Sequence, residues 1–289
     1  MANLKEIRSR IKSVKSIQKV TKAMKMVAAA KLRKSQENME QARPYADRLN
    51  NLIGDLLDDS SKSSINLLSQ KQEVKTTGFI IVTADRGLAG SFNTNIIKKA
   101  EKEINNYDQE NVKLFCIGKK GYEYFSKRGY EVEKYYIDFW NNLNFNIASD
   151  IGKDIIDSFI KNSVDEIKVI YNLFKNVATQ EVKYEQFLPV TYNEEEVENT
   201  TKLVKPLYEP SEKELLELLI PKHLNTQIWK YLLESFASEQ GARMIAMENA
   251  TENAGDMISE LTLEFNKARQ TAITTEMLEI VGGAEALSN

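Results

Sequence analysis

The C-terminal stretch from residue 211 to residue 287 most constrains the fold, because it holds a single early proline and no turn-forming cluster before Gly282 and Gly283. Read as one helix, it would be about 110 Å long. A globular domain of this mass is much narrower, so most of the helix is expected to pack against something outside its own domain. Its apolar residues recur at alternating spacings of three and four, the heptad pattern of a coiled coil: Leu233, Ala237, Met244, Met247, Ala254, Ile258, Leu261, Phe265, Ala268 and Ala272.

The N-terminal residues supply a partner for this helix. A second heptad-like repeat is broken by polar residues at Gln18, Thr21 and Lys25, and its apolar members are Leu4, Ile7, Ile11, Val14, Ala28, Leu32, Met39, Ala42, Ala46, Leu49, Ile53 and Leu56. Residues 1–34 hold eleven Lys or Arg against one acid, and residues 211–289 hold thirteen acids against six bases. Opposite charges favour pairing, although each screened surface pair contributes only about 0.5 kcal/mol or less. The pattern predicts an antiparallel pair of terminal helices.

A second apolar stripe runs beside the first between residues 14 and 32, and consists of Ile17, Val20, Met24 and Val27. A helix that is apolar on more than one side needs packing partners on more than one side. A helix lying on a membrane surface is the alternative, but it would favour interfacial Trp or Phe, which this stretch lacks. Burial inside another protein is therefore the expectation.

Overall composition excludes several classes of protein. The net charge of −3 gives no global attraction to nucleic acid or membranes. One cysteine allows no internal disulfide, which favours a reducing compartment. No run of 18 apolar residues is present, and the first residues contain no apolar signal region. A cytoplasmic, bacterial protein is expected.

The centre of the chain has the pattern of an α/β domain. Residues 78–84 form an unbroken apolar run, typical of a central strand covered on both faces. Further strands are predicted at residues 112–117, 132–136, 166–174 and 181–189, separated by helices. Alternating strands and helices predict a mostly parallel, Rossmann-like sheet of about five strands. The predicted division is an N-terminal coiled-coil helix (1–59), a linker (60–76), a central α/β domain (77–210) and a C-terminal coiled-coil helix (211–289).

No catalytic, cofactor or metal site is evident in the sequence. The stretch from Gly118 to Gly121 lacks the first glycine and the hydroxyl residue of a phosphate-binding Walker loop, and Gly87–Gly90 does not make a dinucleotide fingerprint. The latter loop could still offer amides to an anion, or be a tight turn whose glycines adopt positive φ. The single histidine, His223, is expected to be solvated, and Cys116 to be an inert residue of a core strand.

Two other functions stay open on these residues alone. The basic N-terminal helix could bind nucleic acid, but Lys5, Arg8, Arg10, Lys12, Lys15, Lys19 and Lys22 are spread around it and no DNA-binding module accompanies them. The α/β domain could bind a nucleotide at Gly87–Gly90. Salt-dependent retention on DNA and calorimetric titration with ATP would separate these alternatives.

Several longer motifs resemble one family. Residues 7–11 (IRSRI) and 19–29 (KVTKAMKMVAA) are similar to the N-terminal signature of γ subunits of F-type ATP synthases. Residues 83–93 (TADRGLAGSFN) resemble that family's loop after the first strand, and residues 239–247 (EQGARMIAM) and 267–276 (KARQTAITTE) resemble its C-terminal helix. The motifs occur in the family's order along the whole chain.

The resemblance implies a central-stalk rotor without a catalytic site or cofactor. Its partners would be the α and β subunits of the catalytic hexamer, the ε subunit and the membrane ring of c subunits. Matching positions imply contact with the hexamer for Met24, Arg86, Gly87, Arg269, Gln270 and Thr274, and a place at the ring end near ε for Tyr208 and Glu209. The chain would then be peripheral, on the cytoplasmic face of a bacterial inner membrane.

Overall fold

The computed structural model describes residues 4–57, 65–69, 71, 73–191, 208–209 and 211–288, with side chains of the last helix as far as residue 284. Contacts divide the chain into two compact units. The large unit is residues 29–243, and the small unit combines residues 1–28 with residues 244–289. Two long helices, α1 (Leu4–Leu56) and α6 (Glu212–Ser288), contribute to both units. The domain boundaries drawn from the sequence stay a prediction.

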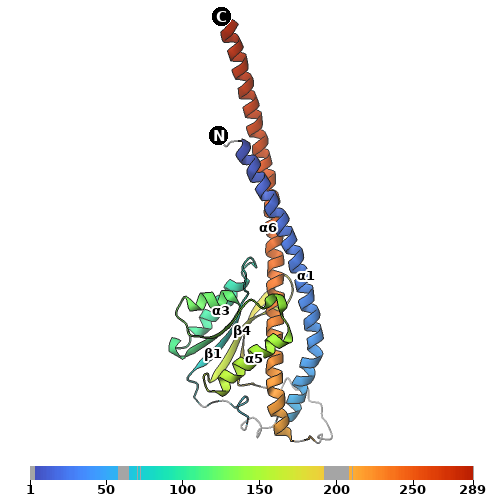
Figure 1. Ribbon diagram of the computed structural model, residues 1–289, viewed down its shortest axis with the longest axis vertical. Coiled ribbons are helices and arrows are strands. Elements are labelled where there is room, and N and C mark those ends of the chain that lie inside the picture. Colours follow the sequence, from blue (N-terminus) through green and yellow to red (C-terminus); the bar gives the residue numbers. More distant parts are fainter. Residues whose placement is uncertain are drawn as a thin grey trace. The chain divides into compact units, whose positions relative to one another are not determined.

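A five-stranded sheet forms the centre of the large unit (Figure 1). Its order is β3–β2–β1–β4–β5, in which β5 runs antiparallel to β4 and the other pairs are parallel. The strands are β1 (Thr77–Val82), β2 (Val112–Ile117), β3 (Val132–Tyr136), β4 (Glu166–Phe174) and β5 (Gln180–Leu188). The predicted mostly parallel sheet is therefore confirmed, with the antiparallel strand at one edge.

Helices cover both faces of the sheet. Phe79 and Ile81 of β1 face the core that holds α3 (Phe92–Ile104) and α4 (Lys119–Ser126). Ile80 and Val82 face the core that holds α5 (Phe145–Ile160) and the first part of α6. Every residue of β1 is buried, which explains its unbroken apolar sequence. Two short 3-10 helices, η1 (Gln109–Asn111) and η2 (Trp140–Asn142), complete the described elements.

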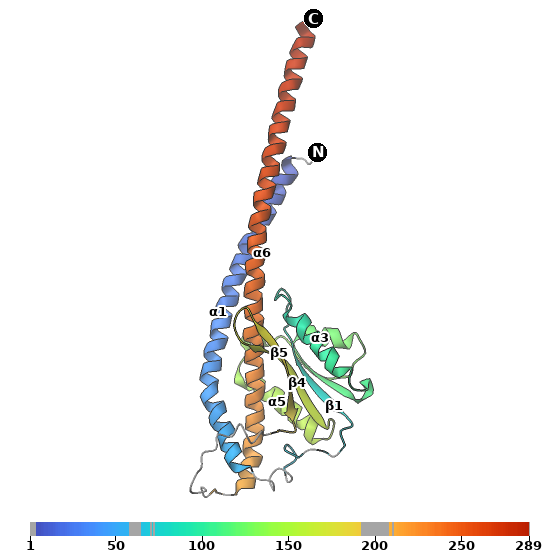
Figure 2. The same cartoon turned by 180° about the vertical axis from the view of Figure 1, so that it is seen from behind.

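The first part of α6 lies between β4 and α1 within the large unit. The backbone N–H of Phe174 donates to Glu234 Oε2 at 2.9 Å, at the end of β4. From the other side, Ser35 Oγ on α1 donates to the carbonyl of Leu233 at 3.1 Å. Figure 2 shows β4 and β5 alongside this stretch of α6. Ser211 caps the helix by accepting from the N–H of Glu214 at 3.2 Å.

His223 corrects a prediction made from the sequence. A solvated residue was expected, but its side chain is only 6% exposed. Gln227 Nε2 lies 3.5 Å from His223 Nε2, one turn farther along α6. The expectation failed because this part of α6 is covered on several sides, so a polar residue can be buried there.

Cys116 lies in the interior of the sheet as a free thiol. Burial raises the pKa of this thiol to about 12, so it stays protonated at neutral pH. Its environment agrees with an inert core residue. Among the described residues, none of the helices combines the length and apolar character needed to cross a bilayer.

Candidate functional site: the loop after β1 and the coiled-coil seam

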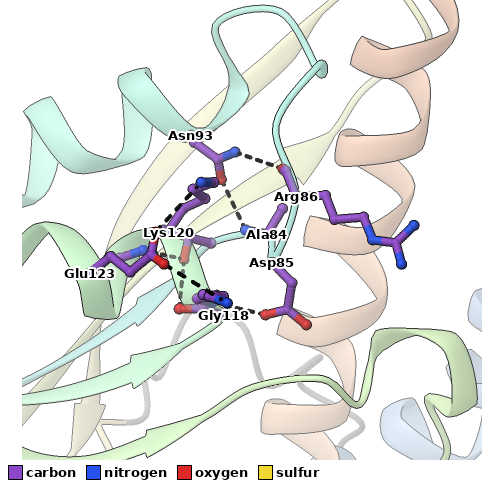
Figure 3. A network of polar contacts seen from close by, with 10 residues as sticks. Ala84, Asp85, Arg86, Asn93, Gly118, Lys120 and Glu123 are labelled. Atoms are coloured by element: carbon purple, nitrogen blue, oxygen red, sulfur yellow. Dashed lines mark hydrogen bonds and ion pairs between the residues drawn. The ribbon is translucent and has the colours of Figure 1, made fainter.

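The loop between β1 and α3 is held at its base by Asn93 (Figure 3). Asn93 Oδ1 accepts from the N–H of Ala84 at 2.9 Å, and Asn93 Nδ2 donates to the carbonyl of Arg86 at 3.3 Å. One side chain thus bridges the two ends of the turn. The backbone of the loop is fixed although it lies at the surface.

Asp85 accepts two hydrogen bonds from backbone N–H groups outside the loop. Its Oδ1 accepts from the N–H of Lys119 at the start of α4 (2.8 Å), and its Oδ2 accepts from the N–H of Asp138 (2.8 Å). A carboxylate at a helix N-terminus satisfies unpaired N–H groups and is stabilised by the helix dipole. The carboxylate of Asp85 therefore joins the loop to the start of α4 and to the segment after β3.

Arg243 of α6 fastens the tip of the same loop. Its Nη2 donates to the carbonyl of Gly87 at 3.1 Å, while its Nη1 pairs with Glu239 Oε1 at 2.6 Å. Both charged side chains are largely buried, at 12% and 7% exposure. Burial raises the pKa of Glu239, although Arg243 and Lys31 act in the opposite direction. The local sequence pattern does not predict a role for this pair, because it cannot reveal a contact between residues 156 positions apart.

The loop nevertheless leaves three consecutive residues exposed: Arg86, Gly87 and Leu88. Figure 3 shows the Arg86 side chain extending away from the hydrogen-bonded network, to which only its backbone contributes. The glycines were expected to adopt positive φ, and Gly90 does so at 55°. The other residue of the loop with a positive φ is Leu88, at 62°, whereas Gly87 does not have one.

In the small unit, α1 and α6 form the predicted antiparallel coiled coil. Ile7, Ala28, Met247 and Ala254 are buried in its seam, the row of residues at alternating spacings of three and four. The polar residues that interrupt the apolar repeat of α1 at Gln18, Thr21 and Lys25 face α6. Those positions stay in the seam as polar residues that have polar partners on the facing helix.

These polar residues make up a layer that we call the polar layer: Gln18, Thr21, Lys25, Glu248 and Thr251. The hydroxyls of Thr21 and Thr251 lie 2.7 Å apart, and Thr251 Oγ1 also donates to the carbonyl of Met247 at 2.7 Å. Gln18 Nε2 reaches the carbonyl of Thr251 at 3.5 Å, and Lys25 pairs with Glu248. Polar groups in a seam favour one alignment of the helices, because any other alignment would bury them without partners. The facing residues explain why a polar seam is tolerated.

The contact between Thr21 and Thr251 predicts a coupling energy between the two residues. Thr21→Val, Thr251→Val and the double variant are expected to give a double-mutant cycle with a coupling of about 0.5–1 kcal/mol in the free energy of unfolding. Urea unfolding of the four full-length chains measures it. Thr271 supplies a matched control, because its hydroxyl donates to the carbonyl of Lys267 on its own helix. A cycle of Thr21→Val with Thr271→Val should be additive, and additivity of both cycles would contradict the prediction.

The predicted hexamer-contact residues fall into separate groups. Arg269, Gln270 and Thr274 are exposed neighbours on α6, where Thr274 Oγ1 donates to the carbonyl of Gln270 at 3.0 Å. Met24 is half-buried on α1 beside the polar layer. The arginine–glutamine pair lies about 30 Å farther along α6 than Glu248, at the rise of an α-helix. The small unit thus carries Met24 near the polar layer, and Arg269, Gln270 and Thr274 nearer the C-terminal end of α6. Arg86 and Gly87 belong to the large unit.

Tyr208 and Glu209, predicted to lie at the ring end, belong to the large unit. Tyr208 is half-buried against the core that contains α5 and α6, whereas Glu209 is exposed. Their place at the ring end near the ε subunit stays a prediction.

Comparisons with known proteins agree on one family. The family model described as ATP synthase matches residues 3–287. The ATP synthase gamma chain of Chlorobium phaeobacteroides (strain BS1) is 46% identical over 99% of both chains. That of Cytophaga hutchinsonii is 46% identical and covers 100% of both chains.

Solved structures show the same fold. A chain from the central stalk and c-ring structure of the Tetrahymena thermophila mitochondrial ATP synthase is 26% identical, with a TM-score of 0.63, and the match covers 80% of this chain and 99% of that one. A chain of the Euglena gracilis mitochondrial ATP synthase is 19% identical, with a TM-score of 0.71 over 98% of this chain and 94% of that one. None of these matches supports the nucleic-acid-binding alternative. The chain belongs to the gamma-chain family of the ATP synthases.

Proposed function

We propose that this chain is the rotor of an F-type ATP synthase central stalk. It would couple rotation of the membrane ring of c subunits to conformational change, and hence to ATP synthesis or hydrolysis, in the β subunits of the catalytic hexamer. Its partners are the α, β, ε and c subunits. The chain itself catalyses no reaction and holds no cofactor. It is peripheral, on the cytoplasmic face of the bacterial inner membrane.

The end of α6 is the observation that carries this proposal. In the small unit Ala272 is the last half-buried residue of α6, and every residue from 273 to 284 is exposed. Apolar side chains are prominent in this single helix, and the exposed ones are Ile273, Met277, Leu278, Ile280 and Val281, at 49–71% exposure. A continuous apolar surface of this kind is typical of a protein-binding segment. An apolar collar formed by another protein would bury it.

The shape of the exposed surface suits rotation within that collar. A single helix rich in small and flexible residues has few deep interlocking features, so it can pass equivalent positions without one dominant minimum. A change in a partner's conformation requires only that the contacts differ between orientations. The polar residues Arg269, Gln270 and Thr274 supply such contacts, since they can form and release hydrogen bonds with a β subunit as the helix turns.

Basic residues on the small unit add a second contact of the same kind. Four of the basic residues spread around α1 line one groove of about 550 Å³ with Phe265 of α6, and they are Arg8, Lys12, Lys15 and Lys19. A row of cations beside an apolar seam favours an acidic protein partner. Met24 and the loop at Arg86 and Gly87 are assigned to the hexamer as well, and Tyr208 and Glu209 to the ring end near ε.

The double substitution Arg269→Ala with Gln270→Ala tests the proposal. Coupled ATP hydrolysis by the assembled complex is expected to fall about tenfold or more, because hydrogen bonds that involve an ionised group contribute about 1.5–3 kcal/mol net. Lys267→Ala is the matched control, an exposed cation on the same stretch of α6. Co-purification with the α and β subunits is measured alongside turnover.

Two results would count against the proposal at different levels. Unchanged turnover in a fully assembled complex would remove Arg269 and Gln270 from the coupling role. Failure of the unmodified chain to assemble with an α/β hexamer would remove the rotor function itself.

A further inference from the structure

A cavity of about 810 Å³ lies within the large unit, where α1, α6 and the end of β5 meet. Figure 2 shows these three elements side by side. The volume is within the range of about 300–1,000 Å³ that is typical of small-molecule sites. Aromatic rings of Phe187, Trp229 and Tyr231 form part of the wall, and charged side chains form much of the rest. Neither the loop after β1 nor the polar layer contributes to this cavity.

Glu234 of α6 lines the cavity with a carboxylate that is only half satisfied. The residue is 9% exposed, and its Oε2 accepts from the N–H of Phe174 at 2.9 Å. Within the described part of the chain, its Oε1 has neither a hydrogen bond nor an ion pair, yet this atom is not sealed from solvent. Burial raises the pKa of the Glu234 carboxyl group, and the N–H of Phe174 with the positive charges of Lys230 and Arg43 offset this only in part. A cation that reaches the second oxygen would stabilise the buried charge.

The cavity as a whole carries a negative charge. Four carboxylates line it from three elements, and they are Glu40 and Asp47 of α1, Glu185 of β5 and Glu234 of α6. Two bases, Arg43 and Lys230, reduce the charge to −2. His223 adds nothing at neutral pH, because burial lowers its pKa to about 4. Glu40 and Asp47 are exposed, and neither has an ion pair with another described residue. The cavity therefore favours a cationic ligand.

The arrangement of the carboxylates distinguishes an extended cation from a compact one. Among the residues that the structure describes, no group of three or more His, Cys, Asp or Glu side chains could hold a metal ion. Glu40 and Asp47 are seven residues apart, which is about 10 Å along a helix axis. One small ion cannot contact both, whereas a linear molecule with several ammonium groups can. The rings of Trp229 and Tyr231 suit such a molecule, because they attract ammonium groups and pack against methylene chains.

We propose that this cavity binds a linear aliphatic polyamine. One ammonium group donates to Glu234 Oε1, another pairs with Glu40 or Asp47 on the opposite wall, and the methylene chain lies against Trp229 and Tyr231. A ligand bound in this way joins α1 to α6 and stabilises the large unit. The inference is independent of the proposed rotor function, since it concerns the chain alone.

Spermidine, a linear triamine, is the probe. Calorimetric titration of the full-length chain at low salt is expected to show one site per chain, and the urea midpoint should rise with the concentration of spermidine. Glu234→Gln keeps an acceptor for the N–H of Phe174 but removes the charge, so the dissociation constant should rise about tenfold or more. Glu217→Gln is the matched control, because it removes an exposed carboxylate of the same helix outside the cavity. The control should bind spermidine within about twofold of the parent.

Two further ligands test the chemical class. Butylamine carries a single ammonium group, so it should bind at least about tenfold more weakly than spermidine. Mg²⁺ should displace spermidine no more than sodium chloride of equal ionic strength does. Specific displacement by Mg²⁺, or equal affinity for butylamine and spermidine, would overturn the assignment of a polyamine.

The site itself is overturned by either of two results. One is the absence of saturable spermidine binding to the parent chain, and the other is parental affinity in Glu234→Gln. Should Glu234→Gln not fold, Glu40→Gln with Asp47→Asn gives the same test, because both side chains are exposed. This double variant is also expected to bind about tenfold more weakly, and unchanged affinity would count equally against the proposal.

Discussion

Gly118→Ala is expected to lower the free energy of unfolding by about 4 kcal/mol. This is the largest loss expected for a glycine-to-alanine substitution in the large unit. A Cβ atom at this position would lie 2.0 Å from the carbonyl oxygen of Thr83 and 2.6 Å from its carbonyl carbon. Backbone atoms cannot move aside as the end of a flexible side chain can. The φ of Gly118, 94°, also lies in a region that favours glycine.

The glycines of the chain provide a graded set of controls. Gly129 has a φ of 78° but open space around its Cβ position, so Gly129→Ala should show the backbone cost alone, about 1–2 kcal/mol. Gly87 has neither a positive φ nor a neighbour within 4 Å, so Gly87→Ala should be nearly neutral. Urea unfolding of the three variants measures the differences. Equal losses for Gly118→Ala and Gly129→Ala would show that the close approach to Thr83 contributes nothing.

The close approach at Gly118 matters because it positions the candidate site. The N–H of Gly118 donates to the carbonyl of Tyr136 at 2.7 Å, and Thr83 Oγ1 accepts from the N–H of Gly121 at 2.9 Å. These contacts hold the start of α4 against the end of β1. Asp85 can then accept from the N–H of Lys119, and the loop that carries Arg86 and Leu88 starts from a fixed base.

The sheet could be predicted from the sequence because its signal is local. A strand buried on both faces must be apolar throughout, and residues 78–84 have that character. The heptad seams were equally visible, since a repeat at spacings of three and four identifies a coiled coil without knowledge of its partner. Loops between the predicted strands are short, which left few possible arrangements.

The polar parts of the fold could not be predicted in the same way. Gln18, Thr21 and Lys25 appeared to break a seam, because the residues that satisfy them lie more than 220 positions away. The burial of His223 depends on packing of α6 within the large unit, which one helix's own periodicity does not reveal. The backbone of Leu88 is set by the loop's tertiary anchors.

Much of the candidate site came from a resemblance and not from physical reasoning. Arg269, Gln270 and Met24 were singled out by motif, and periodicity alone gives no reason to separate them from other exposed or half-buried helix residues. The structure adds what the motifs lack, namely that Arg243 and Glu239 fasten the loop and that α6 continues as a single exposed helix beyond the seam.

Stability is expected to fall by up to about 3 kcal/mol between pH 6.5 and pH 4 because of His223. Burial, with a smaller effect of the nearby positive charge of Lys230, lowers the pKa of this histidine from 6.5 to about 4. The folded chain therefore resists a proton that the unfolded chain accepts. The free energy of unfolding is therefore unaffected by this histidine above pH 6.5 and decreases as the pH falls from 6.5 towards 4.

Because His223 is the single histidine of the chain, its protonation can be followed without assignment of other imidazoles. Its NMR signals in the folded full-length protein should titrate near pH 4. Titration near pH 6.5 in the folded protein would contradict the prediction.

A His223→Gln variant isolates the contribution of this residue to the pH dependence of stability. Glu234 and Glu239 act in the opposite sense, because burial raises the pKa of each carboxyl group, so each stabilises the fold more as the pH falls. Asp154 and Asp165 have lowered pKa values, to which their lysine partners contribute, so they destabilise the fold only at more acidic pH. These carboxylates are common to both proteins, so the difference between parent and variant reports the histidine. That difference should change by up to about 1.4 kcal/mol per pH unit between pH 6 and pH 4.5, where one proton is bound mainly by the unfolded chain, and should level off below pH 4.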